Sequence, residues 1–217
     1  MSDTDLQARL DRAMADLPLV AILRGLTPAE ALPVCRALAE TGFRLMEIPL
    51  NSPDPFDSIA AVRAEMPAEV LVGAGTVTTV EAVARLAGTG AELAVMPHAD
   101  TQVIRAAKAA GLICIPGVAT PTEAFAALAA GADALKIFPA ELVGPAAIRA
   151  MRAVLPKGTR LLPVGGIAPA TMAPFLEAGV AGFGLGSALY RPGDSAATVA
   201  ANARAFVAAF PSAGVPA

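Results

Sequence analysis

The chain has 217 residues, of which 55% are hydrophobic, 16% are charged and 4% are aromatic, and its formal net charge is −3. The sequence contains no cluster of basic residues, which argues against a nucleic-acid partner. No uninterrupted apolar run approaches the about 18 residues of a membrane span, so we expect no membrane partner either. The length suits one domain with a single large core, and we expect that domain to span residues 1–217.

The beginning of the chain, MSDTDLQARLDRAMADLP, is acidic and amphipathic. It lacks the basic and apolar regions of a secretion signal. Cys35 and Cys114 fall in a helical and a strand segment without the spacing of a metal site or a CxxC motif, so we expect two reduced, packed thiols. These features together predict a cytoplasmic protein.

Short apolar runs alternate with alanine-rich helical patterns along the rest of the chain. The predicted strands are Val20–Arg24, Leu45–Leu50, Val70–Gly75, Leu93–Pro97, Ile113–Gly117, Ala134–Phe138, Arg160–Val164 and Gly182–Gly186. The predicted helices are Met1–Leu17, Pro28–Glu40, Pro55–Glu65, Thr79–Ala87, Asp100–Ala110, Thr122–Ala130, Pro145–Val154, Pro169–Glu177 and Asp194–Phe206. Glycines that suit left-handed helix C-caps follow six of the helices: Gly42, Gly90, Gly111, Gly131, Gly158 and Gly179.

Eight strand–helix units predict an α/β protein with a (β/α)8 barrel, closed at one end by the extra N-terminal helix. An open, doubly wound sheet shares the alternation and is the alternative architecture. The count of eight and the lack of an early GxGxxG motif favour the closed barrel. In such a barrel the chemistry lies at the carboxyl ends of the strands, so the residues there are the functional candidates.

One lysine, Lys136, interrupts the apolar strand Ala134–Phe138. A buried ammonium costs free energy unless it is paired or deprotonated, and burial lowers the pKa of a lysine toward the range where its amine is nucleophilic. Alternation along the second strand places Glu47 on the inward face, as it does Lys136 on its own strand. The two side chains suit a nucleophile and an acid/base for carbanion chemistry on a ketone. A structural lysine paired with Asp133 or Glu141, or a buried Glu47–Lys136 ion pair, remains the alternative.

Other candidates also stand at strand ends. Arg24 closes the first strand and Thr76 follows the third, where an arginine can bind a carboxylate or a phosphate and a hydroxyl can orient one. Gly165-Gly166 after the seventh strand and Gly186-Ser187 after the eighth suit phosphate binding by backbone amides. His98 has no second ligand of matching spacing, so we expect a solvated loop histidine and no metal site.

An ordered set of motifs covers nearly the whole chain: ILRG, EIPLNSP, GAGTV, the proline after strand four, PGVATPTE, LKIFPA, VGG and GLGS. This set resembles the class I aldolases that cleave 2-keto-3-deoxy-6-phospho sugar acids. Gluconate-type relatives carry an arginine where this chain has Asn51 and a threonine where it has Val164. The motifs therefore look like those of the galactonate-type members.

The resemblance implies a Schiff base from Lys136 to the C2 ketone, proton transfer by Glu47, and the products pyruvate and D-glyceraldehyde 3-phosphate. It implies no metal or other cofactor, and it implies a homotrimer. It also implies that Arg24 and Thr76 hold the substrate carboxylate and that Pro97 and Phe138 wall the pocket. The apolar Val164 would face the C4 hydroxyl, and the phosphate would be bound by the amides of Gly165, Gly166, Gly186 and Ser187.

Three alternative functions remain open at this stage. Within the family, the substrate could be the gluconate epimer or 4-hydroxy-2-oxoglutarate, because an apolar Val164 gives a preference between epimers rather than exclusion. A sugar-phosphate isomerase or epimerase on the same barrel would use paired carboxylates or histidines. A non-catalytic phosphosugar-binding protein is the third alternative, but binding alone gives no reason to bury a lone amine.

Overall fold

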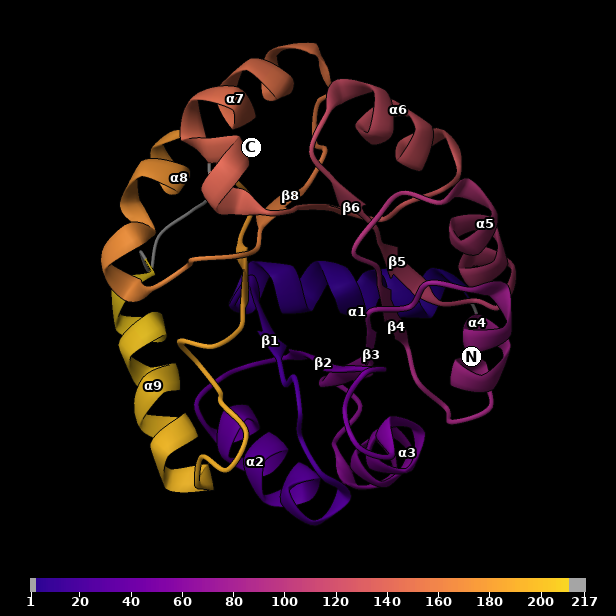
Figure 1. The fold of residues 1–217 in the computed structure, drawn as a ribbon, viewed down its shortest axis with the longest axis vertical. Coiled ribbons are helices and arrows are strands. Elements are labelled where there is room, and N and C mark those ends of the chain that lie inside the picture. Colours follow the sequence, from indigo (N-terminus) through magenta and orange to yellow (C-terminus); the bar gives the residue numbers. More distant parts are fainter. Residues whose placement is uncertain (1–2, 211–217) are drawn as a thin grey trace.

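The computed structural model describes residues 3–210, in which strands and helices alternate (Figure 1). The strands are β1 (Leu19–Ile22), β2 (Leu45–Pro49), β3 (Leu71–Gly75), β4 (Leu93–Val95), β5 (Ile113–Ile115), β6 (Gly117–Val118), β7 (Leu135–Ile137), β8 (Leu161–Pro163) and β9 (Phe183–Leu185). The helices are α1 (Asp3–Asp16), α2 (Pro28–Glu40), α3 (Pro55–Glu65), α4 (Val80–Ala87), α5 (Thr101–Ala109), α6 (Pro121–Ala129), α7 (Ala140–Val154), the 3₁₀ helix η1 (Pro169–Thr171), α8 (Ala173–Glu177) and α9 (Ala196–Ala209).

The strands close into a barrel of parallel pairs. One run of hydrogen-bonded strands has the order β5-β4-β3-β2-β1-β9 and the other has the order β6-β7-β8. Only Pro116 separates β5 from β6, and its carbonyl accepts a hydrogen bond from Lys136 N at 2.9 Å. A bridge between Val164 and Gly184 joins the end of β8 to β9. With β5 and β6 taken as one interrupted strand, the eight-stranded barrel is confirmed and the open-sheet alternative is wrong.

Two layers of apolar side chains hold the barrel together. The outer layer lies between the strands and the ring of helices that surrounds them in Figure 1. The inner layer fills the amino-terminal end of the barrel with the first residues of four strands, Leu45, Leu71, Leu93 and Ile113. Leu6, Leu10, Ala13 and Met14 of α1 pack onto this inner layer. The prediction of an N-terminal helix that closes one end is therefore confirmed for Asp3–Asp16, while Met1 and Ser2 lie outside the described residues.

A buried carboxylate ties α1 and α3 to the sheet at the closed end. Glu92 accepts hydrogen bonds from Arg9 at 2.5 Å and from Arg63 at 2.7 Å, and a third from the backbone of Val72 at 3.1 Å. Because a buried charge is costly without partners, these three donors make the position of Glu92 tolerable. The closed end is thus held by ionic and apolar contacts, and the opposite end is left for a site.

Alternation along β2 and β7 follows the expected pattern. Met46 and Ile48 belong to the outer apolar layer, whereas Leu45 belongs to the inner one. Leu135 and Ile137 are likewise in the outer layer, on either side of Lys136. The inward orientation predicted for Glu47 and Lys136 is therefore confirmed.

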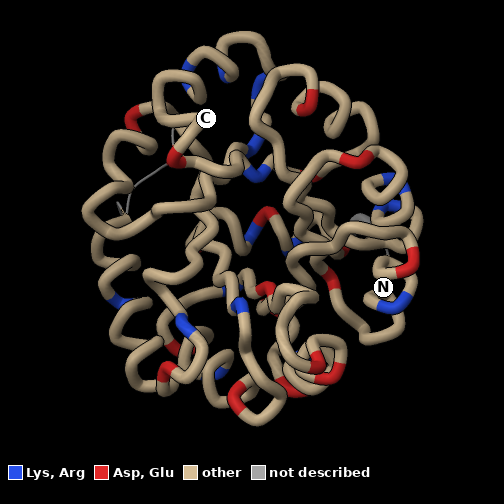
Figure 2. The backbone as a smooth tube through the Cα atoms, viewed as in Figure 1, with Lys and Arg blue, Asp and Glu red and all other residues tan. Residues whose placement is uncertain are grey.

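Two predicted helices differ most from the structure, and the bounds of α4, α5, α6 and α9 differ by one to three residues. Helix α7 begins at Ala140 rather than at Pro145, and its turns are interrupted at Gly144, whose φ of 68° is left-handed. The predicted helix Pro169–Glu177 divides into η1 and α8. Acidic and basic residues are interspersed around the ring of helices (Figure 2). Within residues 3–210, no helix has both the length and the apolar character required to traverse a lipid bilayer.

Candidate active site

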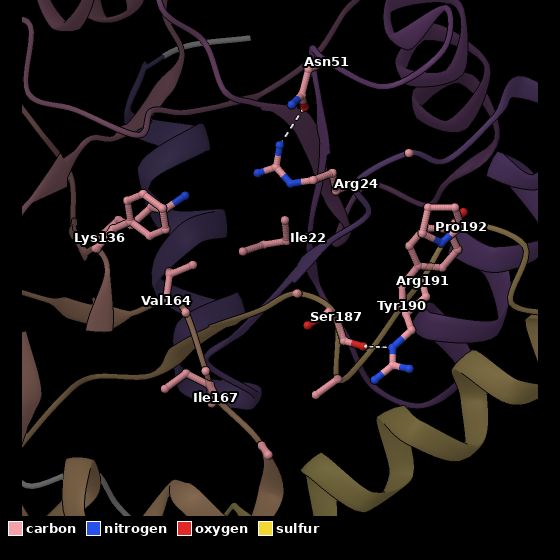
Figure 3. Close-up of a pocket in the computed structure, with 17 residues that line it drawn as sticks. Ile22, Arg24, Asn51, Lys136, Val164, Ile167, Ser187, Tyr190, Arg191 and Pro192 are labelled. Carbon is pink, nitrogen blue, oxygen red and sulfur yellow. Dashed lines mark hydrogen bonds between the residues drawn. The ribbon is translucent and has the colours of Figure 1, made fainter. Parts of the chain in front are cut away.

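A cavity of about 610 Å³ opens at the carboxyl ends of the strands (Figure 3). Nine of the residues that line it were singled out from the sequence: Arg24, Asn51, Lys136, Phe138, Val164, Gly165, Gly166, Gly186 and Ser187. Eight others complete the lining: Ile22, Gly25, Ile167, Ala168, Ala188, Tyr190, Arg191 and Pro192. The structure therefore gathers most of the strand-end candidates around one space.

Lys136 is 5% exposed and lines this cavity from β7. Its Nζ lies 4.9 Å from the centre of the Phe138 ring. Within residues 3–210 its amine makes no hydrogen bond or salt bridge. Burial lowers the pKa of Lys136; the nearby positive charge of Arg24 lowers it further, and Glu47 opposes the shift.

Structural pairing does not explain Lys136. Asp133, one of the two expected partners, instead accepts two hydrogen bonds from Lys108, at 2.9 and 2.8 Å. It also accepts one from the backbone of Cys114 at 2.7 Å. Glu141, the other expected partner, lies against Gly165 and Gly166. Lys136 is thus a buried amine without a salt bridge in the described chain, and Glu47 is the carboxyl group that acts on its charge.

Glu47 shares a small inner space with Lys136, beneath the main cavity. It is 1% exposed, and its Oε2 has no hydrogen-bond partner in the described part of the chain. Burial raises the pKa of Glu47 to about 7, while the positive charges of Lys136 and Arg24 oppose the rise. A carboxyl group with this pKa exchanges protons readily near neutral pH, as a general acid or base must.

Gly75 makes the space for the Glu47 carboxyl. A Cβ atom added at Gly75 would lie 1.2 Å from Glu47 Oε2 and 2.3 Å from its Cδ. Strand pairing sets Gly75 opposite Pro49, two residues beyond the pair Glu47–Gly73. The second glycine of the GAGT motif therefore has a steric role, which alternation of polar and apolar residues could not reveal.

Arg24 is held by the loop that follows β2. Its Nη1 donates a hydrogen bond to Asn51 Oδ1 at 2.7 Å, drawn as a dashed line in Figure 3. The next backbone amide, of Gly25, donates to Ser52 Oγ at 2.9 Å. The two loops thus fix the guanidinium at the cavity mouth, where it acts on the pKa values of Glu47 and Lys136.

The glycines after β8 adopt left-handed backbone conformations that favour glycine. Gly165 has a φ of 107° and Gly166 a φ of 62°. Both line the cavity beside Val164, which packs against Gly184 of β9. Across the same space, Gly186 and Ser187 begin the loop after β9. Residues of the loops after β8 and β9 thus line the same cavity.

Three other candidates lie outside the cavity lining. Thr76 follows Gly75 with a left-handed φ of 56°, which is uncommon for a β-branched residue. Pro97 packs its backbone against Gly117. His98 is exposed, as expected of a loop histidine. Residues 3–210 hold no group of three or more His, Cys, Asp or Glu side chains placed to bind a metal ion.

Sequence reasoning missed Tyr190, Arg191 and Pro192, which reach the cavity from the loop after β9. Arg191 Nε donates a hydrogen bond to the carbonyl of Ser187 at 3.1 Å, so the loop turns back toward the GLGS glycines. The sequence feature that could have indicated Arg191 as a site residue is its place in the short segment between the GLGS motif and the last helix.

Comparisons with known proteins cover most of the chain. The profile of a family described as KDPG and KHG aldolase matches residues 10–199. The chain is 52% identical over 193 residues to a probable 2-dehydro-3-deoxy-6-phosphogalactonate aldolase of Rhizobium meliloti (strain 1021), covering 89% of this chain and 91% of the relative. It is 50% identical over 194 residues to the 2-dehydro-3-deoxy-6-phosphogalactonate aldolase of Escherichia coli (strain K12), covering 89% and 95%. A solved structure described as native KDPGal is 50% identical and superposes with a TM-score of 0.87, covering 89% of this chain and 94% of its own.

Proposed function

The chain belongs to the KDPG and KHG aldolase family and is a carbon–carbon lyase, and we propose that it cleaves 2-dehydro-3-deoxy-6-phospho-D-galactonate to pyruvate and D-glyceraldehyde 3-phosphate. The observation that carries the mechanism is the unpaired, buried amine of Lys136 at the cavity, next to a buried carboxyl group. One (β/α)8 domain carries the whole activity.

Lys136 is the nucleophile of this proposal. Its free amine adds to the C2 ketone, and loss of water from the carbinolamine gives a protonated imine. When the C4 hydroxyl gives up its proton, the C3–C4 bond breaks, and its electron pair moves into the imine. The aldehyde leaves, the remaining enamine takes a proton at C3, and hydrolysis releases pyruvate and the amine. The imine itself accepts the electron pair, so the cleavage requires no metal.

Glu47 moves the protons in these steps, directly or through a water molecule. Its pKa of about 7 keeps both protonation states populated near neutral pH. It would protonate the departing hydroxyl of the carbinolamine, accept the proton of the C4 hydroxyl and return one to the enamine. The small space that Glu47 shares with Lys136 supports this role.

The cavity also suits the two charged ends of the substrate. Arg24, fixed by Asn51, would bind the carboxylate near the ring of Phe138. The phosphate would lie against the amides of Gly165, Gly166, Gly186 and Ser187. Val164 would face the C4 hydroxyl without offering a hydrogen bond, which favours the galactonate epimer over the gluconate epimer.

We also propose a cytoplasmic homotrimer. Large apolar side chains project from the neighbouring helices α6 and α7: Phe125 is 46% exposed, Leu142 83% and Val154 58%. A second copy of the chain would cover them, because such exposed apolar groups are typical of interfaces. Cys35 and Cys114 are free and buried, which suits a reducing compartment. Analytical ultracentrifugation tests the assembly.

Reduction of the imine by borohydride tests the mechanism directly. In the presence of pyruvate, mass spectrometry should find a permanent three-carbon adduct on Lys136 of the wild-type protein. Lys136→Ala should fold, lose the adduct and lose turnover, since the nucleophile is gone. Lys157→Ala, which removes an exposed lysine, is the matched control and should behave as wild type. A label on Lys108 or Lys157, or no label at all, would contradict the proposal.

A further inference from the structure

The charged residues that line the cavity all have the same sign. Of its 17 residues, Arg24, Lys136 and Arg191 are basic and none is acidic. Lys136 lies at one side of the cavity in Figure 3, whereas Arg191 lies at the other side with Ser187. Arg24 acts electrostatically on Lys136, so it belongs to the reacting end. Arg191 is thus a cation at the far end, where no role has yet been given to it.

The loop after β9 holds Arg191 in place. Its Nε donates to the Ser187 carbonyl at 3.1 Å, and its backbone amide donates to Asp194 Oδ2 at 2.9 Å. The adjacent Pro192 packs on the loop after β1, since a Cβ at Gly25 would lie 2.7 Å from Pro192 Cγ. Within residues 3–210, the two Nη atoms make no hydrogen bond or salt bridge. The guanidinium is therefore anchored through Nε and presents its remaining donors to the cavity.

A phosphate at this end needs such a cation. The amides of Gly165 and Gly166 are neutral donors, and the carboxylate of Glu141 lies directly against these glycines. Its Oε2 would be 2.3 Å from a Cβ placed on Gly165. A phosphate dianion bound here would feel this negative charge, and a guanidinium opposite would offset it and bind two phosphate oxygens at once.

We propose that Arg191 binds the terminal phosphate of the substrate and makes the enzyme selective for phosphorylated substrates. The inference rests on the proposed function, because it assigns the reacting end of the substrate to Lys136. Hydrogen bonds from Nη1 and Nη2 to phosphate oxygens would complete a site whose other donors are backbone amides.

The test compares Arg191→Gln and Arg191→Lys with the wild type on two substrates. These are 2-dehydro-3-deoxy-6-phosphogalactonate and the same sugar acid without its phosphate. Arg191→Gln should lower kcat/KM for the phosphorylated substrate about 10- to 100-fold, chiefly through KM, as expected for loss of charged hydrogen bonds. It should leave kcat/KM for the unphosphorylated acid unchanged. Inorganic phosphate should inhibit Arg191→Gln more weakly than the wild type, and Arg191→Lys should regain part of the loss.

Arg204→Gln is the matched control, because Arg204 is an exposed arginine of α9 outside the cavity lining. Equal losses on both substrates in Arg191→Gln would mean a structural role and would overturn the inference, as would unchanged kinetics on both. Borohydride trapping of pyruvate on Lys136 separates this inference from the proposed function. If trapping succeeds and the preference for phosphate survives in Arg191→Gln, only the role of Arg191 fails. If the wild type itself traps no pyruvate, the proposed function fails.

Discussion

Replacing Gly75 by alanine tests how Glu47 is placed, because the new methyl group would stand where the carboxyl group lies. The added Cβ would be 1.2 Å from Oε2, 2.3 Å from Cδ and 2.7 Å from Oε1, so the whole carboxyl group must move. Glu47 is 1% exposed, and its surroundings offer little room. Overpacking of this kind typically costs about 1–3 kcal/mol of stability. We expect the variant to fold with a lowered melting temperature.

The effect on catalysis should exceed the effect on stability. A displaced carboxyl group no longer reaches the atoms between which it transfers protons, and general acid–base catalysis typically contributes about 10²- to 10⁴-fold. We therefore expect kcat of Gly75→Ala to fall about 100-fold or more, toward that of Glu47→Gln. The amine of Lys136 remains in place, so borohydride with pyruvate should still label it, although more slowly.

A double-mutant cycle isolates the steric contact as the cause. In Glu47→Ala the carboxyl group is absent, so adding Gly75→Ala should change neither kcat nor the melting temperature appreciably. The assay is coupled pyruvate release, with thermal unfolding of all four proteins alongside. If Gly75→Ala lowered kcat equally in both backgrounds, the clash with Glu47 would not be the cause. If Gly75→Ala alone had the kcat of the wild type, the idea that catalysis depends on the position of Glu47 would be refuted.

The sequence predicts the barrel well because its strands and helices follow from local sequence patterns, namely alternation along strands and capping of helices. Alternation along β2 and β7 correctly separates Leu45 and Glu47 inside from Met46 outside. Helix α2 has the predicted bounds, Pro28–Glu40, because Thr27 and Glu30 form a capping box at its start. Strand lengths are less predictable: β4 ends at Val95 rather than Pro97, since apolar character continues beyond the last paired residue. The division at Pro116 depends on pairing with β7, which no local pattern contains.

The candidate site was predicted only where strand ends converge. Parallel strands bring their carboxyl ends together, so Arg24, Lys136 and Ser187 could be expected around one cavity. Arg191 was missed because its position depends on a turn of the loop after β9, set by contacts with Ser187 and Asp194. Thr76 follows a strand end, yet the chain turns there with a left-handed φ and the residue does not line the cavity. Loop geometry, rather than strand order, decides such cases.

Two further predictions concern substrate preference and pH. The kcat/KM value should be higher for the galactonate epimer than for the gluconate epimer, because Val164 offers no hydrogen bond to the C4 hydroxyl. Such contacts typically change the transition-state free energy by about 1–3 kcal/mol. A clear preference for the gluconate epimer would exclude this role of Val164. The pKa of Glu47 rises from 4.5 to about 7 on folding, so the folded protein keeps a proton that the unfolded chain releases as pH rises through this window. The free energy of unfolding of the wild type should therefore fall relative to that of Glu47→Gln between these pH values, by about 3 kcal/mol at most. Urea unfolding at a series of pH values measures the free energy of unfolding of both proteins. If the difference between the two free energies did not change with pH, burial would not raise the pKa of Glu47. Proton transfer by Glu47 near neutral pH would then lose its basis.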